Sequence, residues 1–222
     1  MVPLAIEIVT SELTGKPSPV PELKEQDIPF YGVKEAVFPF NMFPEVDPVL
    51  GPEMRSTGEV LGLSRFWGEA FCKAQEATKT ELPMEGTVLI TVCDRDKPEV
   101  ADVARDFAKA GFKIMASRGT AKVIEEAGIE VEIVNKLSEG RRPNTLDLIT
   151  NGKIDIIINT PVGQERMVDD GYLRKAAIKK KIAYFTTMAA AKAGSSGILS
   201  LKTYGSSEVK SLQELHSEIK DK

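Results

Sequence analysis

From Gly86 onward, short runs of β-branched residues alternate with segments of helical periodicity, and this alternation most constrains the fold. Such an order is typical of right-handed βαβ units that build a parallel sheet. The nearly continuous apolar run from Ile154 to Ile158 favours a strand covered by helices on both faces. We predict strands at 87–92, 112–117, 131–135, 154–160 and 182–187, and helices near 97–110, 119–127, 144–151, 167–180 and 188–193. The fold class is therefore α/β, with a doubly wound parallel sheet.

Residues 1–80 follow a different pattern, because many prolines break long elements and predict a mostly irregular or helical segment. A short helix is expected over 4–13. A longer one should begin near Ser56 or Thr57 and bury the apolar positions Val60, Leu63, Phe66, Trp67, Ala70 and Phe71. Residues 79–86 are expected to form a linker, which divides the chain into domains 1–80 and 86–222. An amphipathic helix over 208–220 should end the second domain.

Composition excludes several classes of function. The net charge of −4 argues against a nucleic-acid partner. The two cysteines, Cys72 and Cys93, are too few for a disulfide framework and suit a reducing compartment. The apolar runs are too short for a membrane span, and the amino terminus lacks the marks of a signal peptide. We expect a cytoplasmic protein without a membrane partner.

Polar residues follow the predicted strands at their carboxyl ends, where ligands bind in open α/β sheets. Lysines, hydroxyls, a glycine turn and helix amino termini would meet there and form a phosphate cradle. The alternative is that the segment SRGT only caps a helix and that the lysines are solvated. The candidates for the cradle and its surroundings are Thr91, Lys97, Ser117, Gly119, Thr120, Lys136, Asn159 and Gly163.

Catalytic groups are hard to find in this sequence. His216 is the only histidine and lies among charged residues of the terminal helix, which argues against His-based acid–base catalysis. No nucleophile–base pair, P-loop or metal-ligand cluster can be recognised, and Cys93 is expected to be structural. We therefore predict a binding site, with no catalytic residue, metal or cofactor in this chain.

The segment 33–62 contains FNMFPEVDPVLGPEMRSTGEV, a long and idiosyncratic run. It resembles the end of the second ATP-grasp half of carbamoyl phosphate synthetase large subunits. VPLA near the start and SLQELHSEIK near the end extend the resemblance over nearly the whole chain. The resemblance implies that residues 1–80 are the end of the carbamoyl phosphate domain. It also implies that residues 86–222 are a methylglyoxal-synthase-like allosteric domain.

For the full-length ligase, the resemblance implies ATP, Mg or Mn, and a role in pyrimidine and arginine biosynthesis. The implied partners are the remainder of the large subunit and the small glutaminase subunit. Bacterial members of the family bind the effectors UMP and IMP in this domain. The resemblance assigns the effector phosphate to Lys97, Ser117, Gly119, Thr120 and Lys136, and the base or ribose to Thr91 and Asn159.

Two features depart from that family pattern. Pro161 stands where a second hydroxyl contact is expected after Asn159. Glu35 and Thr186 match two positions of an ornithine site, but its other carboxylates would precede this chain.

Related proteins offer two alternative ligands for this domain. The urea-cycle branch of the family binds N-acetylglutamate but has an aromatic residue in place of the Asn135–Lys136 pair, so a phosphorylated effector is favoured. The same cradle could hold dihydroxyacetone phosphate in a methylglyoxal synthase. That enzyme needs catalytic Asp and His residues, however, and no histidine occurs in 86–200.

Overall fold

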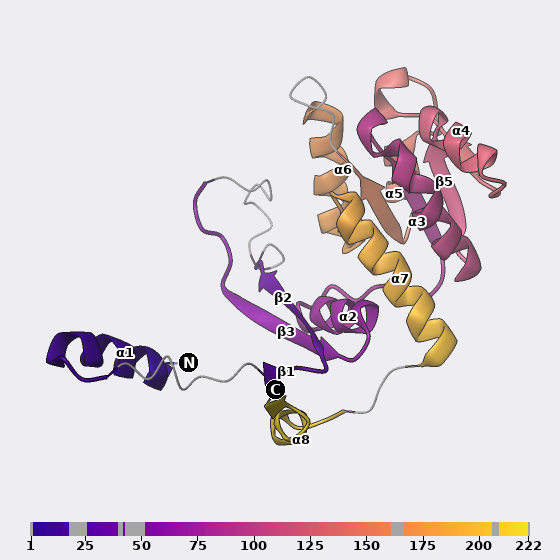
Figure 1. Ribbon diagram of the computed structural model, residues 1–222. Helices are drawn as coiled ribbons and strands as arrows, with labels where there is room; N and C mark the ends of the chain where they lie inside the picture. Colours follow the sequence, from indigo (N-terminus) through magenta and orange to yellow (C-terminus); the bar gives the residue numbers. More distant parts are fainter. Residues whose placement is uncertain are drawn as a thin grey trace. The chain divides into compact units, whose positions relative to one another are not determined.

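The computed structural model forms two compact units, residues 30–207 and residues 1–29 with 208–222 (Figure 1). The larger unit joins the sheet to residues that precede it, whereas the predicted boundary between residues 80 and 86 stays a prediction. The structure describes residues 2–17, 26–39, 42, 52–160, 167–205 and 209–221.

The larger unit is built on a five-stranded parallel sheet with strand order β6-β5-β4-β7-β8. All five predicted strands are present, and each is somewhat shorter than its apolar run. Strand β4 is the central strand, with β5 on one side and β7 on the other, so the chain adds β5 and β6 to one side of β4 and then β7 and β8 to the other. The strands are β4 (Thr87–Thr91), β5 (Lys113–Ser117), β6 (Glu132–Val134), β7 (Ile156–Asn159) and β8 (Ala183–Phe185).

Helices cover both faces of this sheet, which confirms the doubly wound α/β class. Apolar side chains of α3, α4 and α7 pack with Val88, Ile90 and Ile156 on one face. Side chains of α5 and α6 pack with Leu89 and Ile157 on the other. The helices are α3 (Lys97–Lys109), α4 (Arg118–Glu126), α5 (Thr145–Thr150), α6 (Met167–Lys180) and α7 (Met188–Tyr204), with 3-10 turns η2 (Asp94–Asp96) and η3 (Leu137–Glu139).

Helix α7 continues well beyond its predicted end at residue 193. Gly194 and Gly197 would weaken an isolated helix, but here they allow close packing. A β-carbon on Gly194 would come within 2.6 Å of the Phe185 ring, and one on Gly197 within 2.6 Å of the Gly68 carbonyl oxygen. Tertiary packing therefore overrides the low helix propensity.

The prediction of one helix from Ser56 or Thr57 is wrong in its first half, and two of the positions that it was expected to bury, Phe66 and Trp67, are 58% and 45% exposed. Strand β3 (Gly58–Ser64) pairs antiparallel with β2 (Tyr31–Val37), and only α2 (Trp67–Ala77) is helical. Gly58 and Gly62 disfavour a helix. Gly62 also faces α2 so closely that a β-carbon would overlap the Ala70 carbonyl oxygen.

Helix α2 also contacts α7, and Cys72 lies at this contact. Burial, and to a lesser extent the charge of Glu69, raises the pKa of the Cys72 thiol to about 11. At pH 8 only about 0.1% of such a thiol is ionised, against about a quarter of an ordinary cysteine. We therefore expect iodoacetamide to alkylate Cys72 in the native protein about a hundredfold more slowly than glutathione, as followed by peptide mass spectrometry. Equal rates would contradict the buried contact.

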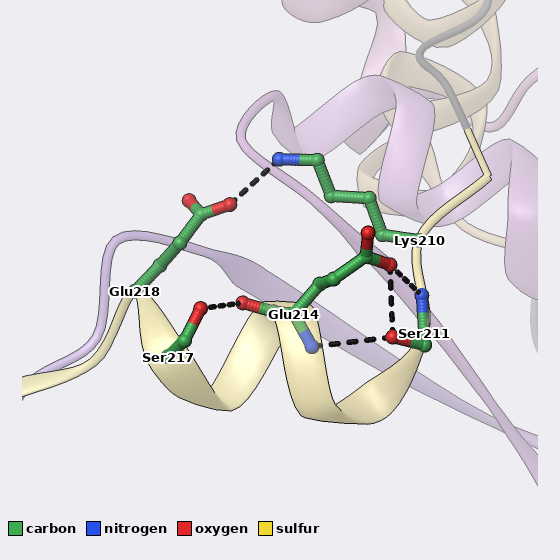
Figure 2. Close-up of polar contacts among 5 residues, drawn as sticks. All are labelled: Lys210, Ser211, Glu214, Ser217 and Glu218. Carbon is green, nitrogen blue, oxygen red and sulfur yellow. Dashed lines mark hydrogen bonds and ion pairs between the residues drawn. The ribbon is translucent and has the colours of Figure 1, made fainter.

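The smaller unit contains α1 (Val2–Thr14), which matches the predicted helix at 4–13, and a two-residue pairing of β1 (Gln26–Asp27) with β9 (Lys220–Asp221). The predicted tail helix is shorter than expected, because α8 (Leu212–Ser217) begins at a capping box (Figure 2). Ser211 Oγ accepts from the Glu214 amide at 3.2 Å, and Glu214 accepts from the Ser211 amide at 2.7 Å. The latter bond chiefly holds the pKa of Glu214 below its ordinary value.

Candidate anion-binding site

The carboxyl ends of the strands bring predicted residues to one edge of the sheet. Thr91 of β4 is in register with Asn159 of β7, and Ser117 ends the neighbouring strand β5. Side chains alternate between faces along a strand, so these three residues lie on the face that also carries Leu89, Met115 and Ile157. All three are buried, and they form the floor of the candidate site.

Lys97 opens α3 at this edge. Its ammonium Nζ pairs with Asp94 Oδ1 at 2.6 Å. A β-carbon on Gly119 would lie only 3.3 Å from the same nitrogen, which places Lys97 against the first turn of α4. Neither α3 nor α4 has a side-chain cap at its amino terminus. A cation therefore lies beside the uncapped first turn of α4, which is an arrangement that anions favour.

Ser117 and Thr120 reach this edge as predicted, but their hydroxyls also belong to the scaffold. Ser117 Oγ donates to Thr120 Oγ1 at 3.2 Å, and the Val92 amide donates to the same oxygen at 3.2 Å. The side chains are 2% and 1% exposed. These bonds tie the first turn of α4 to the end of β4, so the pair orients the amides around Gly119.

Lys136 approaches from the neighbouring strand β6. It follows Val134, which is in register with Ser117, and it precedes η3 as a half-buried residue with extended backbone. Its loop is held where Asn135 Nδ2 donates to the Pro143 carbonyl at 3.2 Å. In the described part of the chain, no hydrogen bond or ion pair connects Lys136 with the other predicted residues, so its position rests on strand register.

Three residues whose side chains bond at this edge, Asp96, Thr160 and Tyr184, were not predicted as site residues. Asn159 Nδ2 donates to the Tyr184 hydroxyl at 2.7 Å. Thr160 Oγ1 accepts from the Cys93 amide at 3.0 Å, and the hydrogen bond between Thr160 and Asp96 is the main cause of the lowered pKa of that carboxyl. This network fixes the loop that carries Lys97. The order Asn-Thr after a strand hinted at Thr160, whereas Tyr184 resembled an ordinary strand residue.

The remaining predicted positions contribute less to this geometry. Glu35 lies half-buried on β2, where burial raises the pKa of its carboxyl. Thr186 is exposed just after β8. No hydrogen bond or ion pair joins these two among the described residues, and the ornithine assignment stays a prediction. Pro161 and Gly163 lie outside the described residues.

The described residues contain neither a metal-binding cluster nor a membrane-spanning helix. They include no group of three or more His, Cys, Asp or Glu side chains placed to hold a metal ion. Their helices are likewise too short or too polar to cross a bilayer.

Known proteins provide an independent comparison. Residues 99–186 match the family described as "MGS-like domain". The chain is 47% identical to a "Carbamoyl phosphate synthase large chain, C-terminal section" from Methanopyrus kandleri, over 97% of this chain and 40% of that protein. It is 50% identical to a "Carbamoyl phosphate synthase large chain" from Pseudomonas putida, over 86% of this chain and 17% of that protein. A methylglyoxal synthase structure from Elizabethkingia anophelis covers 59% of this chain and 89% of its own, with 21% identity and a TM-score of 0.43.

The family match covers the chain from the first turn of α3 to the end of β8, whereas Thr91 and Lys97 lie just before it. The sheet and its edge therefore define an α/β domain of the MGS-like type. The chain as a whole resembles the carboxy-terminal portion of carbamoyl phosphate synthase large chains, as its sequence predicts. It spans less than half the length of these relatives.

Proposed function

We propose that this chain is the regulatory carboxy-terminal region of a glutamine-hydrolysing carbamoyl phosphate synthase large subunit. It binds a phosphorylated effector such as UMP or IMP at the carboxyl edge of the parallel sheet. The observation that supports the proposal is the position of Lys97 Nζ against Gly119, in the first turn of α4, whose amino terminus has no side-chain cap.

Local charge outweighs the negative net charge of the chain at such a site. A lysine about 4 Å from a phosphate oxygen gains about 4 kcal/mol at an effective dielectric constant near 20, against about 1 kcal/mol in water. Desolvation removes part of that gain. Helix amides contribute further because their hydrogens already point toward the anion and need little reorganisation.

Regulation requires that effector binding alter the contacts between this domain and the rest of the enzyme. Helix α7 begins at Met188, just after β8 at the effector edge, and further along it packs on α2 through Gly197 and Gly68. Helix α2 in turn packs on β2 and β3, in the segment that resembles the end of an ATP-grasp half. A shift of α7 would therefore reach that segment, with a coupling of about 1–3 kcal/mol as is typical of allosteric proteins.

The wider enzyme belongs to the same proposal. The remainder of the large subunit would supply ATP and metal binding, and the small subunit would supply glutaminase activity, in the cytoplasm. The product would serve pyrimidine and arginine synthesis. Glu35 and Thr186 would be two parts of an ornithine site that upstream residues complete.

Lys136 provides a direct test by isothermal titration calorimetry with UMP. Lys136→Ala should weaken binding about tenfold, because one charge-assisted contact to the phosphate is lost. Lys113→Ala is the matched control, since that lysine lies at the opposite end of β5 and pairs with Glu132. An unchanged affinity in Lys136→Ala would remove this residue from the cradle.

A further inference from the structure

Arg174 on α6 has a buried side-chain nitrogen whose role the fold does not explain. Its guanidinium carbon lies 5.9 Å from the centre of the Tyr184 ring. Among the described residues, Arg174 Nε is the buried side-chain nitrogen or oxygen that has no hydrogen-bond partner. A guanidinium only donates hydrogen bonds, and a buried donor without an acceptor is unfavourable. Packing on Tyr184 alone does not account for that donor.

Tyr184 connects Arg174 with the candidate effector site. Its hydroxyl accepts from Asn159 Nδ2 at 2.7 Å, and Asn159 is in register with Thr91. The phosphate cradle lies over β4 and β5, whereas Tyr184 belongs to β8, two places beyond β4 in the sheet. Neighbouring strands are about 4.8 Å apart, so the cradle and the Arg174 cluster are separated by roughly 10–14 Å. A bare phosphate is too short to reach both, whereas a nucleotide has a suitable length.

We propose that Arg174 recognises the base of a nucleoside monophosphate by donating hydrogen bonds to a ring carbonyl oxygen. This inference rests on the proposed function and adds a specificity-determining residue to it. Because guanidinium has no acceptor, the site would favour a base with a carbonyl edge, such as uracil, over one with an amino group at that position, such as cytosine. UMP and CMP form the matched pair of probes, since they share phosphate, ribose and the C2 carbonyl and differ only at ring positions 3 and 4, where uracil has an N–H and a carbonyl and cytosine has an acceptor nitrogen and an amino group.

The test is calorimetric titration of the whole chain with UMP, CMP and ribose 5-phosphate, which retains the phosphate and sugar but has no base. Arg174→Met keeps most of the aliphatic packing and removes the donors. It should weaken UMP binding about tenfold or more, bring the UMP-to-CMP affinity ratio close to one, and leave ribose 5-phosphate binding within about twofold. Arg174→Lys keeps the charge but not the planar donors, and it should also lose the discrimination. Lys175→Met, on the same helix, is the matched control and should keep it.

Several outcomes would overturn the inference. One is that the Arg174→Met variant binds UMP with the affinity of the wild-type protein. Another is that this variant loses affinity for UMP and for ribose 5-phosphate by the same factor, which indicates a general electrostatic or structural role. If Arg174→Met does not fold, as judged by its thermal unfolding, Arg174→Lys decides: discrimination retained in that variant rejects the inference. Failure of wild-type protein to bind any of the three probes would reject the proposed function as well. Equal binding of UMP and ribose 5-phosphate that Lys97→Ala abolishes would reject only the role of Arg174.

Discussion

Lys97→Ala is expected to weaken UMP binding by about a hundredfold, the largest effect of any single cradle residue. The reason is geometric. The ammonium already lies against the first turn of α4, so an anion held by the amides around Gly119 would meet this charge without rearrangement. The side chain is 29% exposed, and partial burial strengthens its attraction for phosphate relative to a solvated lysine. Isothermal titration calorimetry at constant ionic strength measures the loss.

Two further variants separate this site effect from general electrostatics. Lys122→Ala removes an exposed lysine from α4 that is 3.9 Å from Glu126, and it should leave UMP affinity within about twofold because exposed charges are screened. Asp94→Asn weakens the 2.6 Å pairing that competes for Lys97, and it should strengthen binding by about threefold, a small gain since Asp94 is exposed. Equal losses in Lys97→Ala and Lys122→Ala would show that only net charge matters.

Gly68→Ala should lower the free energy of unfolding of the larger unit by about 3 kcal/mol. A β-carbon at this position would be 2.7 Å from Gly197 Cα and 2.9 Å from Gly197 N. These atoms are backbone of α7 and cannot turn aside as a flexible side chain can. The two helices must separate, and their contact next to Cys72 and Phe71 is lost.

Urea unfolding followed by circular dichroism measures this change. Gly171→Ala is the matched control, because Gly171 also lies in a helix but has nothing within 4 Å of the added carbon. It should raise stability by about 0.5–1 kcal/mol through helix propensity alone. Unaltered stability in Gly68→Ala would contradict the close packing of α2 on α7.

The sheet could be predicted because each strand and helix shows its own periodicity, and because βαβ connections have one handedness. The β2–β3 hairpin could not. Val60 and Leu63 satisfy a helical spacing as well as a strand, and the partner strand lies more than 20 residues earlier in the chain. Gly194 and Gly197 led to a predicted helix end at residue 193, which is too early. A glycine that permits close helix packing is indistinguishable in sequence from one that ends a helix.

The candidate site followed from the same topological rule. Once the strand order is known, the residues after β4, β5 and β7 must lie close together. Lys97 lies against Gly119, and Cys93 bonds to Thr160. The bond from the Val92 amide to Thr120 Oγ1 depends on the spacing between two neighbouring strands and so was not visible in the local sequence, whereas the bond between Ser117 and Thr120 joins residues only three apart. Arg174 and Tyr184 were missed because their contact joins a helix to the strand that follows it, and the periodicity of each element alone does not show that contact.

The most direct test of effector binding at the carboxyl edge is a two-dimensional ¹H–¹⁵N titration of the whole chain with UMP. We predict that the amide signals of Lys97, Gly119 and Thr120 shift with one saturating dependence on UMP concentration. A separate cavity of about 600 Å³ at the amino edge, lined by Glu81, Gly152 and Lys181 among others, should be unaffected. Saturating shifts at Gly152 and Lys181 with none at Gly119 would place the ligand at the wrong edge of the sheet and contradict the account.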